Sequence, residues 1–220
     1  MTNELKKRLI TSVLLIFLLI LMFFYTFILI VSLIIVAVIS WIEFYALISK
    51  IFRRENKSNK ILRFICKTIS LFYLSILIYF ILGARINSTE LEIFIVYSIL
   101  ISIMSDIGGL ITGRIFKGKK LTKISPKKTI SGSIGSLIFS ISLIPLFIQS
   151  LPDMNIYTLF FITLIISLVS QIGDLFISYL KRKANVKDTS NLLPGHGGIL
   201  DRIDGIIFSI PAGYLIFNFF

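Results

Sequence analysis

The sequence predicts an all-α, polytopic integral membrane protein, a helical bundle of about seven transmembrane helices with a cytoplasmic N-terminus. Three observations support this fold class. Hydrophobic residues make up 56% of the 220 residues, mean hydropathy is +0.94, and only 15% of the residues are charged, which is unlike a soluble domain. Long uncharged runs recur along the chain, and basic residues gather in only some of the segments between them.

The first uncharged run covers residues 9–42. Continued as helix to Ser49, it would be about 61 Å long, whereas the hydrocarbon core of a bilayer is roughly 30 Å thick. We therefore expect two spans here, with a turn near Tyr25 and Thr26.

The later spans are expected at about residues 62–82, 92–114, 128–153, 155–180 and 204–220. Between the end residues of these spans, Asp106 lies inside the second and Asp174 inside the fourth. An ionisable side chain inside a span is costly unless it is paired or faces a polar cavity, so it indicates a functional site.

Orientation follows from the basic residues. With the N-terminus in the cytoplasm, Arg85 is the one basic residue of 23 in an external segment. The chain then divides into residues 1–90, with about three spans, and residues 91–220, a transmembrane region with cytoplasmic loops 113–131 and 181–203 in which we expect any catalysis to take place. Topology explains the net charge of +12, so no nucleic-acid partner is needed. We expect a multi-pass protein of the cell (inner) membrane with a cytoplasmic active site.

Aspartates concentrate in the second half of the chain. Five of the six lie at or beside predicted cytoplasmic span ends: Asp106, Asp174, Asp188, Asp201 and Asp204. Of these, Asp174, Asp201 and Asp204 offer up to three carboxylates to Mg²⁺. Cys66 and His196 are single, which excludes a Cys/His zinc site and leaves oxygen as the metal ligand. For any one aspartate, a structural pair with Lys or Arg is the alternative.

Two sequence patterns are suited to binding a phosphate group. Asp174, Ser178 and Lys181 fall at helical positions i, i+4 and i+7, so an acid, a hydroxyl and an ammonium share one face. Three glycines around His196 free the backbone to approach phosphate oxygens. The alternatives are a helix end whose cations reach the headgroups, and a loop histidine bonded to backbone.

The loop at residues 113–131 is strongly basic. Basic residues beside a bilayer attract anionic lipid by about 1 kcal/mol each. The lysines of residues 117–123 are typical of a topology determinant. Residues 125–129, SPKKT, place hydroxyls beside cations, as a phosphate site would.

Residues 178–204, SYLKRKANVKDTSNLLPGHGGILDRID, resemble the signature of the phosphatidate cytidylyltransferases, also called CDP-diacylglycerol synthases. The match comprises a serine, a Lys-Arg pair, a Lys-Asp pair, Pro-x-His-Gly-Gly and Asp-Arg-x-Asp at the family's spacing. Residues 106–114 and 125–129 are similar to the family's upstream elements, so the resemblance covers roughly residues 100–210. The chain departs from the family at Ser131-Gly132 and Gly108-Gly109.

The resemblance implies a Mg²⁺-dependent nucleotidyltransferase of phospholipid biosynthesis, which converts CTP and phosphatidate into CDP-diacylglycerol and pyrophosphate. It implies Asp174 and Asp201 as first metal ligands and Asp204 as a third, with Ser178 and Lys181 also catalytic. The substrate-binding residues that it implies are Arg114, Ser125, Lys127, Lys128, Thr129, Arg182, Lys187, Asp188, His196, Gly197, Gly198 and Arg202. CTP, phosphatidate and the bilayer are the expected partners. A monovalent cation such as K⁺ and a homodimer stay open.

Other functions also stay open. One is another CTP-dependent membrane lipid enzyme, either an ether-lipid cytidylyltransferase or a polyprenol kinase. The other is a cation-coupled transporter, which would place its carboxylates near the bilayer midplane rather than beside basic loops.

Overall fold

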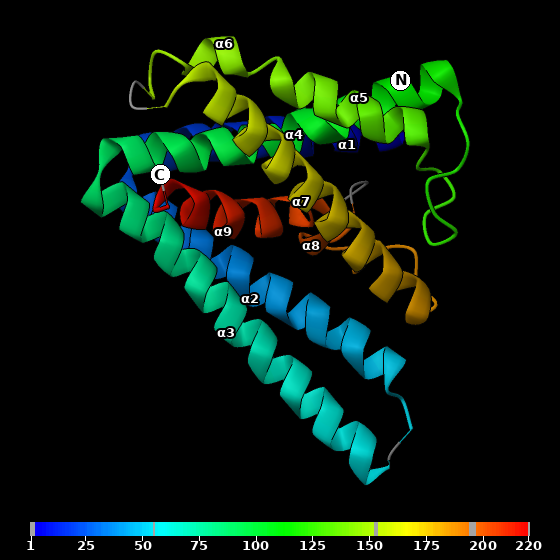
Figure 1. Cartoon of the computed structure of the whole chain (residues 1–220). Helices are drawn as coiled ribbons and strands as arrows, with labels where there is room; N and C mark the ends of the chain where they lie inside the picture. Colours follow the sequence, from blue (N-terminus) through cyan, green and yellow to red (C-terminus); the bar gives the residue numbers. More distant parts are fainter. Residues whose placement is uncertain (1–2, 55, 152–153, 194–196, 220) are drawn as a thin grey trace. The chain divides into compact units, whose positions relative to one another are not determined.

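The structure, a computed structural model, describes residues 3–54, 56–151, 154–193 and 197–219. Helices make up most of this part of the chain (Figure 1). In order they are α1 (Asn3–Phe24), α2 (Thr26–Ile51), α3 (Lys57–Asn87), α4 (Thr89–Phe116), α5 (Ile130–Ile141), α6 (Ile144–Phe147), α7 (Ile156–Lys183), α8 (Leu200–Ile203) and α9 (Ile206–Phe217). The described residues contain isolated antiparallel bridges, Lys120 to Thr129 and Leu193 to Gly197, and no longer strand. The predicted all-α class is confirmed.

Several helices are able to span a bilayer. Among the described residues, five helical segments are long and apolar enough: Thr26–Ile51, Lys57–Ile86, Thr89–Phe116, Ile130–Phe147 and Ile156–Lys183. Val13–Phe24 and Ile206–Phe217 are shorter apolar helices in the first and last predicted spans. The polytopic membrane class is therefore confirmed, whereas the count of seven and the cytoplasmic N-terminus stay predictions.

Two breaks interrupt the apolar runs. Tyr25 has an extended backbone (φ −119°, ψ 105°) and separates α1 from α2, which confirms the turn predicted there. The predicted span at residues 128–153 contains a break that the sequence analysis did not place, since α5 ends at Ile141 and α6 begins at Ile144. Pro145 explains this break, because it has no N–H to donate to the carbonyl one turn earlier.

Hydroxyl side chains mark two helix starts. Ser88 Oγ accepts a hydrogen bond from Leu91 N at 3.0 Å and caps α4. Thr129 Oγ1 accepts one from Gly132 N at 3.1 Å and caps α5. Both bonds satisfy backbone N–H groups that have no partner within the helix itself.

The chain forms two compact units. Unit 1 consists of Met1–Ile78 and Leu180–Arg202, and unit 2 consists of Tyr79–Tyr179 and Ile203–Phe220. The functional division proposed at about residue 90 stays a prediction.

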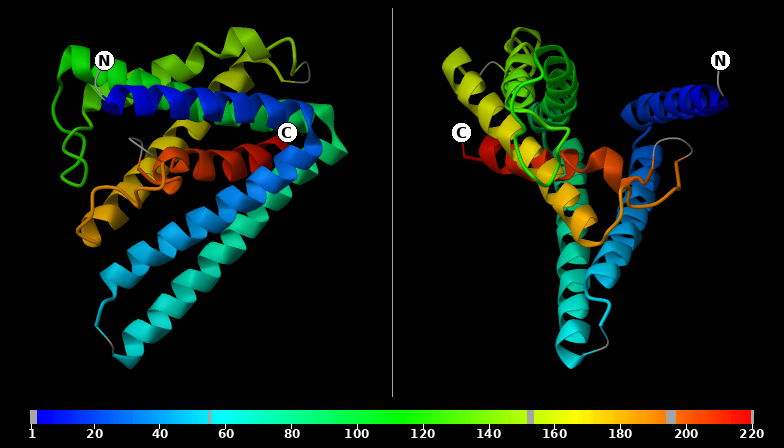
Figure 2. Two further views of the ribbon diagram at one scale, coloured as in Figure 1. Left: turned by 180° about the vertical axis from the view of Figure 1, so that it is seen from behind. Right: turned by 90° about the vertical axis from the view of Figure 1, so that its right-hand side faces the viewer.

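In unit 1, α2 and α3 lie side by side (Figure 2). Trp41 Nε1 donates to the carbonyl of Lys67 at 3.1 Å. The Lys67 ammonium lies 4.9 Å from the ring centroid of Trp41 and 4.8 Å from that of Tyr45, which gives two cation–π contacts. These contacts fix the stretch of α2 that carries Glu43.

In unit 2, glycines bring α4 and α5 into backbone contact. A Cβ on Gly108 would lie 2.6 Å from the Gly135 carbonyl oxygen, and one on Gly132 would lie 2.9 Å from the Gly109 carbonyl oxygen. A Cβ on Gly135 would lie 2.0 Å from Thr112 Oγ1. Small residues of this kind allow close helix packing in a membrane, where lipid tails are as apolar as the side chains.

Buried hydroxyls join α4, α5 and α7 inside unit 2. Ser102 and Ser170 are 2.7 Å apart at their hydroxyl oxygens, and Ser140 Oγ donates to Ser167 Oγ at 3.0 Å. Ser167 Oγ in turn donates to Ser105 Oγ at 3.3 Å. Such bonds between helices contribute about 0.6 kcal/mol on average in membrane proteins. They fix the position of α7, which carries Asp174.

We expect Gly135→Leu to weaken the α4–α5 packing, because its side chain would overlap Thr112. Overpacking of this kind costs about 1–3 kcal/mol. The thermal unfolding midpoint of the purified protein in detergent should fall by several degrees. Ile138→Val, on the same helix at a side chain that is 60% exposed, is the control and should leave the midpoint unchanged. Equal midpoints for both variants would contradict the close packing.

Candidate functional site

The site in unit 1 begins where α7 ends. Asn185 has a left-handed backbone (φ 56°), and its N–H donates to the carbonyl of Arg182 at 3.1 Å. Val186 N donates to the carbonyl of Lys181 at 3.0 Å. This pair of bonds is a Schellman motif, for which Asn is one of the few suitable non-glycine residues. The chain therefore leaves the helix just after its basic last turn.

The following segment, residues 186–199, is called here the signature loop. It folds back on itself through paired backbone hydrogen bonds between Leu193 and Gly197, at 2.8 and 3.2 Å. Gly197 has φ +85°, a conformation that side-chain-bearing residues rarely adopt. Pro194, Gly195 and His196 lie outside the described residues, so the predicted role of the histidine stays a prediction.

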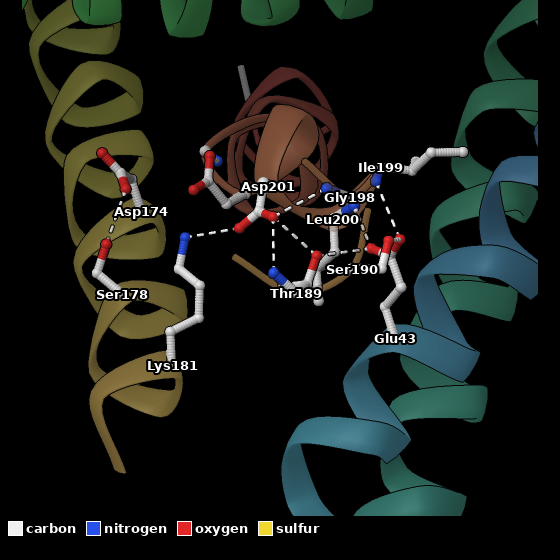
Figure 3. A network of polar contacts seen from close by, with 12 residues as sticks. Glu43, Asp174, Ser178, Lys181, Thr189, Ser190, Gly198, Ile199, Leu200 and Asp201 are labelled. Carbon is white, nitrogen blue, oxygen red and sulfur yellow. Dashed lines mark hydrogen bonds and ion pairs between the residues drawn. The ribbon is translucent and has the colours of Figure 1, made fainter. Parts of the chain in front are cut away.

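Asp201 holds the base of this loop (Figure 3). Its Oδ1 accepts from Lys181 Nζ at 2.7 Å. Its Oδ2 accepts from Thr189 N at 2.8 Å, Thr189 Oγ1 at 2.9 Å and Gly198 N at 3.1 Å. Only 5% of the Asp201 side chain and 12% of the Lys181 side chain are exposed. One buried carboxylate thus joins the end of α7 to both limbs of the signature loop.

These contacts set the charge of Asp201. Burial alone raises its pKa, but the hydrogen bond and charge of Lys181 and the N–H groups of Thr189 and Gly198 outweigh burial. The pKa of Asp201 therefore lies below its ordinary value. The carboxylate is ionised at neutral pH, and its stabilising effect on the fold is lost only as the pH falls through this lowered pKa.

Glu43 is a second buried acid, which the sequence analysis missed. It lies on α2 with 4% of its surface exposed and accepts four hydrogen bonds from the segment of residues 189–200. A signal for it was available, because Glu43 interrupts the apolar stretch of residues 9–49 and an acid inside a span indicates function. The acids predicted above to form the site were all aspartates.

In unit 2, Asp174 lies on α7 and forms an ion pair with Lys128. Its Oδ1 also accepts a hydrogen bond from Ser178 Oγ at 3.3 Å, which confirms that these two residues neighbour each other one helical turn apart (Figure 3). The helix continues to Lys183, so the spacing that relates Asp174 to Lys181 is helical throughout. In unit 2, Asp174 thus brings together an acid, the hydroxyl of Ser178 and the cation of Lys128.

The segment that supplies Lys128 is itself ordered by backbone bonds. Leu121 N donates to the Lys128 carbonyl at 2.8 Å, and Lys128 N donates to the Ser125 carbonyl at 3.0 Å. Thr129, predicted to bind substrate, uses its hydroxyl to cap α5. The structure thus assigns Thr129 a structural contact, and its substrate role stays a prediction.

One turn before Asp174, α7 carries a further polar group that the sequence analysis missed. Gln171 Oε1 accepts from Ser133 Oγ at 2.6 Å. Gln171 Nε2 is buried, and no hydrogen-bond partner lies within reach among the described residues. An amide in an apolar helix is the signal that could have identified it.

Asp204 is buried at 7% exposure, and its Oδ1 accepts from Gly205 N at 3.0 Å. A Cβ on Gly173 would lie 3.0 Å from the Asp204 carbonyl oxygen and 2.3 Å from the Phe208 ring. Gly173 therefore allows the chain at Asp204 to pack directly against α7, next to Asp174.

The predicted metal ligands belong to different units. Asp174 and Asp204 lie in unit 2 and Asp201 in unit 1. In the part of the chain that the structure describes, no three acid, His or Cys side chains form a group that could hold a metal ion. The metal site thus stays a prediction. Other predicted residues are exposed: Arg114, Lys127, Arg182, Lys187, Asp188 and Arg202.

The Lys181–Asp201 pair gives a testable coupling. Removing one partner of a buried ion pair leaves an uncompensated charge and costs about 3–5 kcal/mol. We expect Lys181→Met and Asp201→Asn each to lower the thermal unfolding midpoint, and the double variant to lower it by less than the sum of the two. An additive double variant would contradict the pairing.

The sequence model of the cytidylyltransferase family matches residues 1–220. A phosphatidate cytidylyltransferase of Rickettsia typhi is 44% identical over 134 residues, which cover 57% of this chain and 58% of the relative. One of Rickettsia prowazekii is 42% identical over 139 residues, which cover 59% of this chain and 60% of the relative. One of Staphylococcus epidermidis is 45% identical over 121 residues, which cover 54% of this chain and 46% of the relative.

The chain thus spans about half the length of these relatives, from 46% to 60%. The family match, in contrast, extends along all of residues 1–220. The chain belongs to the cytidylyltransferase family.

Proposed function

We propose that this protein transfers the cytidylyl group of CTP to phosphatidate. A phosphate oxygen of phosphatidate forms a bond to the α-phosphorus of CTP, and the bond from that phosphorus to the bridging oxygen of the β-phosphate breaks. The products are CDP-diacylglycerol and pyrophosphate. The observation that carries this proposal is the buried Lys181–Asp201 pair within the stretch that resembles the family signature.

The reaction brings two anions together, so its main requirement is positive charge in fixed positions. Lys181 and Lys128 meet this requirement, since each is held by a carboxylate, Asp201 or Asp174. Each ammonium is thereby fixed beside its carboxylate and keeps further N–H groups that can donate to phosphate oxygens. The exposed Arg182 and Arg202 side chains are further candidate donors. No side chain has to act as a nucleophile, because phosphatidate supplies the attacking oxygen.

We propose Mg²⁺ as the cofactor, held by Asp174, Asp201 and Asp204. The donor set fits this ion, because these residues offer oxygen ligands only and Mg²⁺ prefers one or two carboxylates together with substrate phosphate. When bound, the ion would offset charge on the triphosphate and the leaving pyrophosphate. Asp174 and Asp201 are each paired with a lysine, so each of these proposed cation ligands would lie beside a positive charge that can contact substrate phosphate.

The proposed location is the cytoplasmic face of the cell membrane. The acyl chains of phosphatidate remain in the bilayer while CTP is dissolved in the cytosol, so the reaction requires a site at the membrane surface. The basic residues near the ends of α4 and α7 favour the cytoplasmic side by the positive-inside rule.

A labelled-nucleotide assay tests the reaction. Purified protein in phosphatidate-containing vesicles with Mg²⁺ should move label from CTP labelled at the α-phosphate into the organic extract. CTP labelled at the γ-phosphate should leave no label there. Transfer of γ-label to a polyprenol would identify a kinase, transfer of α-label only to an ether-linked acceptor would identify the ether-lipid enzyme, and no transfer to any acceptor would reject the proposal.

The acids of the proposed cation site can be tested singly. We expect Asp174→Asn and Asp201→Asn each to abolish transfer of α-label while the protein still appears in the membrane fraction. Glu90→Gln, the same chemical change at an exposed acid in the first turn of α4, should retain wild-type transfer. Full activity in both aspartate variants would remove the cation assignment.

A further inference from the structure

Glu43 contacts the signature loop and α8 through both of its carboxylate oxygens. Oε1 accepts from Ser190 Oγ at 2.5 Å and from Ile199 N at 3.1 Å. Oε2 accepts from Thr189 Oγ1 at 2.9 Å and from Leu200 N at 2.8 Å. All four donors are hydroxyl or backbone groups and none is a cation, so within the part of the chain that the structure describes Glu43 is not half of a salt bridge.

The four donors come from both limbs of the signature loop and from the first residue of α8. Thr189 and Ser190 precede the fold-back at Leu193, and Ile199 and Leu200 follow it. A single side chain of α2 therefore joins both limbs and ties them to a helix about 150 residues earlier in the chain. Figure 3 shows Glu43 on the opposite side of these groups from Lys181.

Thr189 links Glu43 to Asp201. Its hydroxyl lies 2.9 Å from Oε2 of Glu43 and 2.9 Å from Oδ2 of Asp201, and it carries only one hydrogen. The two carboxylates thus share one hydroxyl group. A change in one carboxylate alters the hydrogen bond available to the other.

Gly198 gives an independent sign that the loop is shaped around Glu43. A Cβ at this position would lie 2.6 Å from Oε2 and 2.7 Å from Oε1 of Glu43, and 2.0 Å from Thr189 Oγ1. Glycine is therefore needed for the backbone to approach the acid this closely. This contact accounts for the second glycine of the Gly-Gly pair in the signature.

The geometry points to Glu43 as a positioning residue, which holds the signature loop so that Asp201 and Lys181 keep the arrangement needed for cytidylyl transfer. Glu43 itself contacts loop and α8 groups and acts through Thr189. This inference rests on the proposed function for its catalytic consequence. The structural part of the inference, that Glu43 keeps the signature loop ordered, does not depend on which reaction the protein catalyses.

Glu43→Gln is the informative variant because it keeps the shape of the side chain. An amide nitrogen replaces one acceptor oxygen and then faces one hydroxyl and one backbone N–H. In one orientation of the amide these belong to Ser190 and Ile199, and in the other to Thr189 and Leu200. The hydroxyl can rotate, but the backbone N–H loses its acceptor. Glu90→Gln is the matched control at an exposed acid.

Hydrogen exchange tests the loop without reference to activity. In membrane-embedded protein, the amides of residues 189–193 and 197–200 should exchange on the order of tenfold faster in Glu43→Gln than in wild type. Amides of residues 159–170 in α7 should keep wild-type rates, and Glu90→Gln should leave both segments unchanged. Unchanged exchange at residues 189–193 and 197–200 in Glu43→Gln would overturn the inference. If that variant does not fold, Gly198→Ala displaces the loop while keeping the acid and should show the same faster exchange.

Kinetics tests the positioning. We expect Glu43→Gln to lower kcat by roughly 10- to 100-fold, the usual effect of a small misplacement of catalytic groups, with a much smaller change in the KM for CTP. Because Glu43 acts through Thr189, the combined Glu43→Gln and Thr189→Val variant should lose less activity than the product of the single losses.

A wild-type kcat in Glu43→Gln, or losses that multiply in the combined variant, would overturn the positioning role. Absence of transfer in the wild-type protein would instead reject the proposed function, and the exchange rates alone would then decide whether Glu43 holds the loop.

Discussion

The carboxylate of Asp201 is the group on which the candidate site depends. It is almost fully buried and accepts four hydrogen bonds, one from Lys181 at the end of α7 and three from Thr189 and Gly198 in the signature loop. A buried charge is tolerated only when its lone pairs are satisfied in this way. The end of the helix and both limbs of the loop are therefore ordered together, and Glu43 strengthens the same arrangement from α2.

Much of the architecture followed from hydropathy and charge. Uncharged runs located the long helices, and the excess length of the first run required the break found at Tyr25. Helical spacing also placed Ser178 beside Asp174. These features depend on local sequence, because a helix in a bilayer satisfies its own backbone and needs only apolar side chains over a sufficient length.

The partners of the site residues could not be predicted in the same way. The pairs Lys128–Asp174 and Lys181–Asp201, and the contact of Glu43 with a loop about 150 residues later, depend on tertiary packing. The glycine spacing in α4 and α5 predicts close packing only once the two helices are known to be neighbours. Pro145 is different, since its missing N–H was visible in the sequence and the break before α6 could have been predicted.

Determination of the structure with CTP and Mg²⁺ bound in a lipid environment would test the central claim most directly. If the signature loop and the end of α7 form the nucleotide site, the triphosphate will contact Lys181, and Thr189 will still bridge Asp201 and Glu43. A nucleotide bound away from residues 181–201, with the Lys181–Asp201 pair intact, would contradict it.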